Sequence, residues 1–410
     1  MAESSDRPKL RPVEAFQTET QGTRVLALRD PAGFTDSVLL LPLPLLDIVS
    51  LFDGEHSILD IQAEIMRHRG ELLFREEIDR ILATLDEHGF LDSPRFAERR
   101  ARMVEAFRRS PTRPPVHAGS AYAREPEALR AQIDDFFAPP DGPGAPGAPR
   151  SPSLRAIISP HIDFHRGGPT YAWAYREVAE RSDADCFVIL GTCHAGMTDP
   201  FALTLKDYET PLGPAVVDRE FAGALSRRYG SSLMESELAH RAEHSIEFQA
   251  VFLRYLLAGR REFTIVPILA SFLHDCLALG KEPGADPAVE RFLDALRETI
   301  AACGRRVCLV AGADLAHVGP RFGDPEPVTG SWLRTVESED RALLEAAIAL
   351  DPAGFFALVA RGGDRRRICG LSPIYALLRT VEARSGVLLR YGQWPDPQGT
   401  VTFASVAFSA

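Results

Sequence analysis

The chain has little lysine, few cysteines and no long apolar run, and each scarcity excludes a class of protein. Only three of its 46 basic residues are lysines, at positions 9, 206 and 281, and the net charge is −11. An acidic chain of this kind lacks the clustered positive surface that nucleic-acid binding requires. No apolar stretch approaches the length of a membrane span, and the N-terminus has no signal-peptide core. We therefore expect neither a nucleic-acid nor a membrane partner.

The six cysteines include no CxxC pair and show no regular spacing. Free thiols in apolar runs behave as small hydrophobic side chains, and this usage fits a reducing compartment. The phosphate-binding pattern GxxxxGK[ST] is also absent, and GxGxxG occurs only as GPGAPG at 142–147, in a proline-rich stretch that does not join a strand to a helix. We expect a cytoplasmic protein without a nucleotide cofactor.

A chain of 410 residues is too long for one ordinary core, so we expect more than one domain. Residues 1–110 read as a small α+β or winged-helix-like module. Its segment LFDGEHSILDIQAEI, followed by a helix and GFL, resembles the PqqD-type peptide-recognition fold. That resemblance implies binding of a peptide or partner protein, and a purely structural appendage is the alternative. The pattern predicts strands over 23–28 and 38–41, and helices over 45–52, 58–69 (capped by Ser57) and 75–88.

Residues 111–153 are expected to form a helical segment followed by a semi-flexible linker, PPDGPGAPGAPRSPS, at 139–153. The second domain, 154–410, alternates short apolar runs with helical patterns. This alternation predicts an α/β fold with a mainly parallel sheet sandwiched by helices. The expected strands are 156–159, 186–190, 263–269, 307–311, 388–391 and 401–408, and the expected helices are 170–180, 219–229, 245–257, 288–302, 338–349, 352–360 and 373–385.

Polar side chains follow several of the predicted strands where each strand ends. His161, Asp163 and His165 come directly after the first strand, and Cys193 and His194 follow the second. Reactive groups collect at the carboxyl ends of strands in open α/β sheets. These residues are therefore the first candidates for a site.

Two further segments carry residue types of the same kind. AEHSIE, which opens a helix, presents Glu243, His244 and Glu247, and GADLAHVG supplies Asp314 and His317. A lone histidine beside apolar sequence is usually structural, but four such segments together indicate a common site. Imidazoles with carboxylates suit a divalent transition metal, or a metal-free acid–base cluster.

The second domain resembles the Memo family, the B component of the AMMECR-Memo-radical-SAM association. The motifs SPHIDFHRGGPTYAWAY, VILGTCHAG, AEHSIEFQAVFL, GADLAHVGPRF and ICGLSPI occur in the family's order and spacing. The resemblance covers the chain from about Leu154 to the C-terminus. It implies a fold like that of class III extradiol dioxygenases, which are non-haem iron enzymes.

The resemblance implies that His161 and His194 are metal ligands and that His244 is a general acid or base. It also assigns Asp314 and His317 to the catalytic group. Animal members are expected to place a ligating cysteine between the latter two, where this chain has Ala316. Alanine cannot bind a metal, so the site loses much of its metal affinity unless another residue supplies the third ligand.

Asp163 is the first candidate for the third ligand, because an extended segment would turn it the same way as His161. His165 is the second candidate and Cys193 the third, and a site without any substitute is a further alternative. Cys369, in ICGLSPI, is interpreted as structural, at a tight turn before a helix.

These assignments predict a metal site of His161, His194 and Asp163, with iron as the first choice and copper or zinc as alternatives. In this hypothesis His244 transfers a proton while Glu243 or Glu247 orients its ring. The chemistry would be of the non-haem-iron dioxygenase type on an unknown small molecule or peptide. The alternative is a non-catalytic binding or scaffold protein, with a radical-SAM or AMMECR-type partner held by the N-terminal domain. A hydrolase using Cys193 beside His194 is the third hypothesis.

Overall fold

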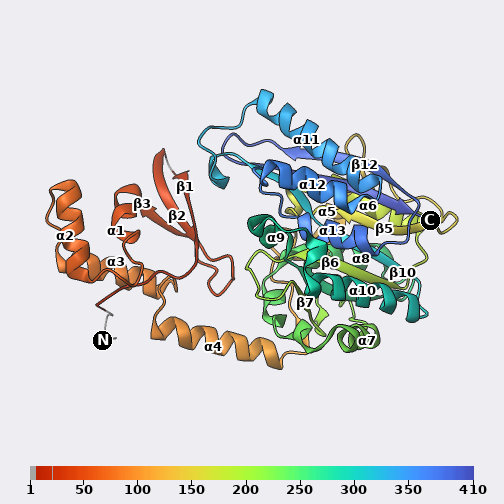
Figure 1. Ribbon diagram of the computed structural model, residues 1–410, viewed down its shortest axis with the longest axis horizontal. Coiled ribbons are helices and arrows are strands. Elements are labelled where there is room, and N and C mark those ends of the chain that lie inside the picture. The colour runs from red at the N-terminus through yellow and green to blue at the C-terminus, as the bar shows by residue number, and fades with distance from the viewer. Residues whose placement is uncertain (1–5, 21) are drawn as a thin grey trace. The chain divides into compact units, whose positions relative to one another are not determined.

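The computed structural model describes residues 6–20 and 22–410 (Figure 1). The chain divides into two compact units, Met1–Arg109 and Ser110–Ala410. In the described part of the chain, no helix is both long and apolar enough to cross a membrane.

The N-terminal unit combines a small antiparallel sheet with helices. Ser57 caps the second helix through a capping box with Asp60, and Gly70 ends it in a left-handed conformation. The sheet has three strands where two were predicted, because the first strand, EAFQTET, is almost wholly exposed and lacks an apolar pattern. The elements are β1 (Glu14–Thr20), β2 (Thr23–Arg29), β3 (Leu39–Pro42), α1 (Leu46–Val49), α2 (Ile58–Arg69), α3 (Arg75–Glu87) and α4 (Pro94–Arg109).

The segment expected to be a helix and a linker belongs to the second unit, which begins at Ser110. α5 (Pro126–Phe137) buries its apolar face, and the proline-rich stretch after it is held by polar contacts. Trp173 donates to the Asp141 carbonyl over 3.0 Å, and Glu180 accepts from the Gly147 amide over 2.8 Å. Proline and glycine exclude regular structure here, as expected, but they do not prevent packing.

The second unit is built on an eight-stranded sheet whose centre is parallel. The central strands run in the order β5 (Leu154–Ser159), β10 (Val307–Gly312), β6 (Cys186–Thr192) and β9 (Thr264–Ala270). The prediction of a parallel sheet is confirmed for this centre, whereas both edges are antiparallel. The antiparallel strands outside this centre are β7 (Phe201–Leu203), β11 (Asp314–Val318), β12 (Ser385–Trp394) and β13 (Thr400–Ser409), of which β13 pairs with β5.

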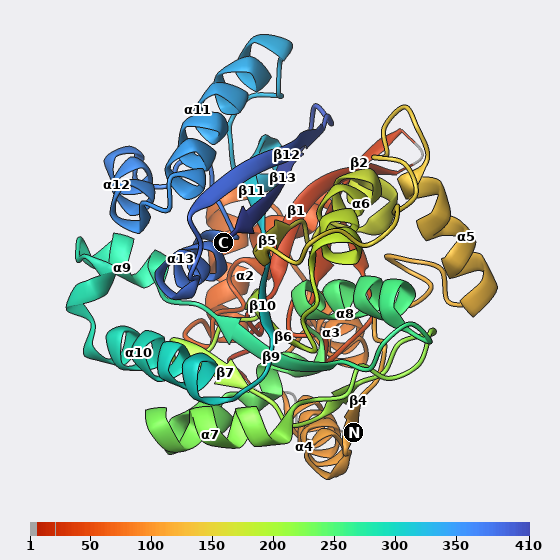
Figure 2. The same ribbon diagram turned by 90° about the vertical axis from the view of Figure 1, so that its right-hand side faces the viewer.

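Helices cover both faces of this sheet (Figure 2). Ile158 and Val188 point into one apolar core, and Ile157 and Ile189 point into the other. Strands buried on both faces read as continuous apolar runs, which is why the sequence located them. The first core is closed by α7 (Arg219–Tyr229), α9 (Leu273–Leu279), α10 (Pro287–Ala302), α11 (Gly330–Ile348), α12 (Pro352–Gly362) and α13 (Leu371–Thr380), and the second by α5, α6 (Phe164–Arg181) and α8 (His244–Leu257).

Three predicted helix boundaries are wrong. α11 begins at Gly330 instead of residue 338. α6 begins at Phe164 instead of residue 170, and it continues through Pro169, a residue that normally argues against a helix interior. α13 ends at Thr380, and β12 already begins at Ser385. The early start of α6 changes the geometry expected around His161.

Candidate metal centre

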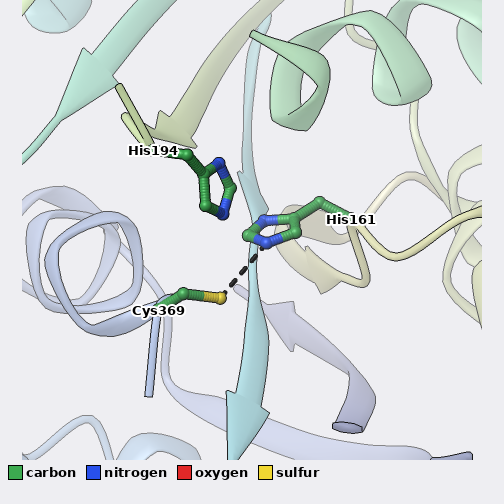
Figure 3. A group of neighbouring side chains, drawn as sticks. All are labelled: His161, His194 and Cys369. Atoms are coloured by element: carbon green, nitrogen blue, oxygen red, sulfur yellow. Dashed lines mark hydrogen bonds between the residues drawn. The ribbon is translucent and has the colours of Figure 1, made fainter. Parts of the chain in front are cut away.

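Two imidazoles and one thiol converge at the carboxyl end of the parallel strands (Figure 3). The ligand atoms of His161, His194 and Cys369 all lie within 4.8 Å of one another. The Cys369 thiol lies 3.2 Å from Nε2 of His161. Since β5 and β6 both flank β10, the residues that follow their ends meet at one edge of the sheet.

The orientation of the His161 ring is set by the backbone of β10. Its Nδ1 donates to the carbonyl of Gly312 over 2.9 Å. A carbonyl only accepts, so this tautomer leaves the lone pair on Nε2, the nitrogen that faces Cys369. The His161 amide donates to Asp314 over 2.9 Å, which anchors the backbone of the same residue.

Glu243 holds His194 in the same manner. His194 Nδ1 lies 3.0 Å from one carboxylate oxygen of Glu243, and its backbone amide donates to the other over 2.9 Å. This arrangement again places the lone pair on Nε2. A histidine whose second ring nitrogen is held by a carboxylate is the usual arrangement of a metal-ligating imidazole.

Cys369 arrives from a loop that approaches the sheet closely. A Cβ on Gly370 would lie 2.4 Å from the Asp314 carbonyl oxygen, so only glycine permits this approach. Thr192 donates to the Cys369 carbonyl over 3.1 Å. The cysteine interpreted from sequence as structural thus lies beside both imidazoles, and the CG pair of ICGLSPI was the signal that could have identified it.

His244 completes a cluster of three imidazoles. Its ring stacks on that of His194 with the centroids 4.6 Å apart, and the His161 ring lies 5.3 Å away. His244 Nδ1 is 3.4 Å from Glu243. Gly312 allows the start of α8 to reach this position, because a Cβ there would meet the Ser245 carbonyl oxygen at 2.5 Å.

Burial keeps most of this cluster uncharged. It lowers the pKa of His161 to about 3, with the neighbouring His194 adding to the effect. Burial and Asp314 raise the pKa of the Cys369 thiol well above its usual range. For Glu243, burial opposes ionisation, but the adjacent histidines outweigh it and lower the pKa well below its usual value. Burial thus favours a neutral His161 and a protonated Cys369 thiol, beside an ionised Glu243.

Asp314 and His317 border the cluster. Asp314 lies 3.6 Å from His161 Nε2, and burial raises its pKa to about 6 despite hydrogen bonds from the backbone amides of His161 and Ile162. Burial lowers the pKa of His317 to about 4, against the attraction of Asp314.

Asp163 and His165 do not join the cluster. The extended geometry that would have aligned Asp163 with His161 is wrong, because α6 begins at Phe164 and Asp163 becomes its N-cap. The Asp163 carboxylate lies 3.7 Å from Arg166, and the His165 ring faces Trp394 at 6.0 Å. The helical start therefore removes both first choices for the third ligand.

Ala316 and Cys193, the other two positions weighed for a ligand, lie in apolar or buried surroundings. Ala316 packs in an apolar cluster with Val318 and Val336. Cys193 is buried, and burial followed by the charge of Glu243 raises the pKa of its thiol to about 12. A thiol with such a pKa is a poor nucleophile at neutral pH, so the geometry does not favour the hydrolase hypothesis.

Residues from 110–122 support the site, and sequence reasoning missed them. Arg113 is fully buried, forms an ion pair with Glu247 and donates to the Glu243 carbonyl over 2.7 Å. The Tyr122 hydroxyl also donates to Glu247, and the His117 amide donates to it over 3.1 Å. Glu247 therefore anchors the start of α8 and does not orient His244. Arg113 stood in a segment with no visible motif.

Comparison with known proteins places these observations in a family. A family model described as Memo-like protein matches residues 113–408. A MEMO1 family protein of Aquifex aeolicus is 28% identical over 407 residues, covering 98% of this chain and all of the relative. MEMO1 family proteins of Methanopyrus kandleri and Methanothermobacter thermautotrophicus are 32% and 30% identical, and cover 72% and 70% of this chain and 98% and 95% of their own lengths. This chain belongs to the family of Memo-like proteins.

Proposed function

We propose that this protein binds one transition-metal ion through His161, His194 and Cys369 and acts as a metal-dependent oxidoreductase on a small molecule. The observation that carries the proposal is the convergence of the three ligand atoms within 4.8 Å. Each imidazole also has its Nδ1 held by an acceptor, which leaves Nε2 for the metal.

The donor set differs from the one expected from sequence. Two histidines and a carboxylate would suit non-haem iron, whereas Cys369 supplies a softer ligand. Imidazole with thiolate suits copper and zinc as well as iron. We therefore propose copper ahead of iron, the first choice from sequence, because zinc suits these ligands but has no redox chemistry of its own.

A bound metal would supply Lewis acidity and, for copper or iron, one-electron chemistry. The protein's own residues would do the rest. Cys369 would release its proton when the metal binds. His244, held through Nδ1 by Glu243, would exchange a proton with the substrate through its other ring nitrogen, and Asp314 would keep the His161 backbone in place.

Metal analysis of the purified full chain tests this proposal. After reconstitution and desalting, we expect about one metal ion per chain in the wild type and less than a tenth of that in His161→Ala and His194→Ala. The matched control is His165→Ala, a histidine exposed on α6, which should keep its metal. Equal metal content in wild type and His161→Ala would refute the assignment.

The second candidate function is recognition of a partner protein by the N-terminal unit. Leu59, Leu72 and Phe74 are large apolar side chains in this unit that are 74%, 71% and 61% exposed. Exposed apolar side chains mark interaction surfaces where they form a contiguous patch, and we propose that these three contribute to one. The relative from Methanopyrus kandleri covers 72% of this chain, whereas the relative from Aquifex aeolicus covers 98% of it.

We propose a peptide, or a radical-SAM or AMMECR-type protein, as this partner, in a reducing cytoplasm that suits six free cysteines. Co-purification with a candidate partner should succeed with the wild type and fail with the double variant Leu59→Glu, Phe74→Glu. The metal content of that variant should be unchanged. Equal recovery of the partner with both proteins would exclude this surface.

A further inference from the structure

A cavity of about 270 Å³ opens beside the metal centre, with His194 and Cys369 in its wall. Ala270 is the only member of the wall without a polar side-chain atom. Cavities for drug-sized ligands span roughly 300–1,000 Å³ and are lined mainly by apolar and aromatic groups. This cavity is smaller, and no aromatic ring of Phe, Tyr or Trp among the described residues lines it.

The charged part of the wall consists of His274, Asp364 and Arg367. The Asp364 carboxylate is already engaged, since one oxygen accepts from the Ile368 amide over 3.0 Å and the other lies 3.3 Å from His274 Nε2. Arg367 directs both terminal nitrogens at Asp324, at 3.1 and 2.9 Å. The acceptors near the cavity are therefore largely used.

Several hydrogen-bond donors of the cavity wall, in contrast, have no acceptor in the part of the chain that the structure describes. Among the described residues, His274 Nδ1, Arg367 Nε and the Ser271 hydroxyl have no hydrogen-bond partner. A wall with spare donors and occupied acceptors is complementary to a ligand group that accepts hydrogen bonds. Among small organic groups, a carboxylate is a particularly strong acceptor of hydrogen bonds from such donors.

The loop that carries Asp364 and Arg367 also has an unusual backbone conformation. In the described part of the chain, non-glycine residues with positive φ are Leu350, Asp364 and Arg367, at 57°, 48° and 50°. Two of these three line the cavity. Left-handed backbone at non-glycine residues is unfavourable and collects at functional sites, so the loop holds Asp364 and Arg367 in place for a purpose beyond connection.

We infer that this cavity binds a small aliphatic hydroxycarboxylate. Its hydroxyl oxygen faces the metal centre and its carboxylate meets Arg367, His274 and Ser271. The inference rests on the proposed metal site for the position of the hydroxyl group. It departs from the catechol ring that a dioxygenase-like fold suggests, because the wall formed by the described residues offers no Phe, Tyr or Trp on which an aromatic ring would stack.

Binding measurements on the full chain test this inference. We would titrate the Co(II)-loaded and the metal-free protein with L-lactate, with its neutral isostere L-lactamide, and with 4-nitrocatechol, using calorimetry and the Co(II) absorption bands. We expect lactate to bind at least tenfold more tightly than lactamide and 4-nitrocatechol. Equal binding of lactate and lactamide, or tighter binding of 4-nitrocatechol, would overturn the inference.

Two variants locate the carboxylate. Arg367→Gln should weaken lactate binding at least tenfold, and His274→Gln, at a half-exposed position that tolerates substitution, about threefold. The control is Arg365→Gln on the same loop, whose partner is Glu339 and which does not line the cavity. An equal loss in Arg365→Gln, or no loss in both cavity variants, would overturn the inference.

The two proposals fail in different ways. If Co(II) binds and shows its thiolate absorption but lactate does not bind, the hydroxycarboxylate is excluded while the metal site stands. If Co(II) does not bind, yet the metal-free protein binds lactate in an Arg367-dependent manner, the metal site fails and the carboxylate contact is supported.

Discussion

Two loops each carry a candidate third ligand for the site at His161, and only one of them places its side chain there. The turn between β5 and α6 carries Asp163, two residues away in sequence, whereas the loop before α13 carries Cys369, which is 208 residues away. Asp163 becomes the N-cap of a helix and lies near Arg166, while the Cys369 thiol lies 3.2 Å from the His161 ring. Nearness along the chain was therefore a poor guide to nearness in space.

The largest expected effect is a loss of metal affinity, and it distinguishes the loop that carries Cys369 from the turn that carries Asp163. Cys369→Ser should lower metal affinity by about 100-fold or more, because the thiolate is one of three proposed ligands. Asp163→Ala should change it less than twofold. Cys193→Ser, at a second cysteine in the same cavity wall, is the control for loss of a thiol. Competition titration with a chromophoric chelator measures all three, and a greater loss in Asp163→Ala would reverse the comparison.

A smaller effect is expected from the residue that orients His194. Glu243→Gln keeps the size of the side chain but removes the charge that holds His194 Nδ1 at 3.0 Å. Loss of such a partner typically costs about 10–100-fold in metal affinity. The same chelator titration measures the loss, and circular dichroism checks the fold. An affinity equal to that of the wild type would show that Glu243 is not coupled to the metal.

The close approach of the Cys369 loop can be tested through its glycine. In Gly370→Ala the new methyl group would lie 2.4 Å from the Asp314 carbonyl oxygen and 2.6 Å from the Ala313 Cβ. Overpacking of this kind costs about 1–3 kcal/mol in the free energy of unfolding. Gly362→Ala, at the end of α12, meets only a side-chain nitrogen of Arg365 at 3.6 Å and should cost less than about 0.5 kcal/mol. Urea denaturation compares the two, and equal effects would argue against the tight approach.

The smallest expected effect concerns the anchor of the same loop. Arg366 pairs with the buried Asp340, which also accepts from Tyr391 over 2.9 Å and from Thr402 over 2.6 Å. Burial raises the pKa of Asp340 to about 6 even though Arg366 opposes the shift. Because the folded pKa lies above the usual 3.8, Asp340 contributes stability that is complete below pH 4 and is lost as the pH rises through 6.

This shift predicts how Asp340→Asn behaves. The difference in free energy of unfolding between wild type and variant should fall by about 1 kcal/mol between pH 5 and pH 7, and chemical denaturation at several pH values measures it. A difference that rises with pH would show that the carboxylate is stabilised by Arg366 more than it is penalised by burial.

Much of the fold could be predicted because strands buried on both faces read as apolar runs. The central strands beginning at Leu154, Cys186, Thr264 and Val307 were located to within two residues. The ends of these strands then identified His161 and His194, since parallel neighbours end at one edge of the sheet. Arg113 and the packing of the proline-rich segment after α5 were missed, because they depend on contacts with distant residues that leave no local periodicity.

The sequence by itself determined the α/β architecture, the family and the two imidazoles of the proposed centre. The tertiary structure alone decided which third side chain joins them. In an extended segment, alternate side chains point the same way, which would have aligned Asp163 with His161. Because α6 begins at Phe164, the segment is not extended there and this alignment is lost. Cys369 reaches the site because Gly370 allows its loop to pack against the backbone of Asp314. These two segments are distant in sequence, so their contact depends on tertiary packing.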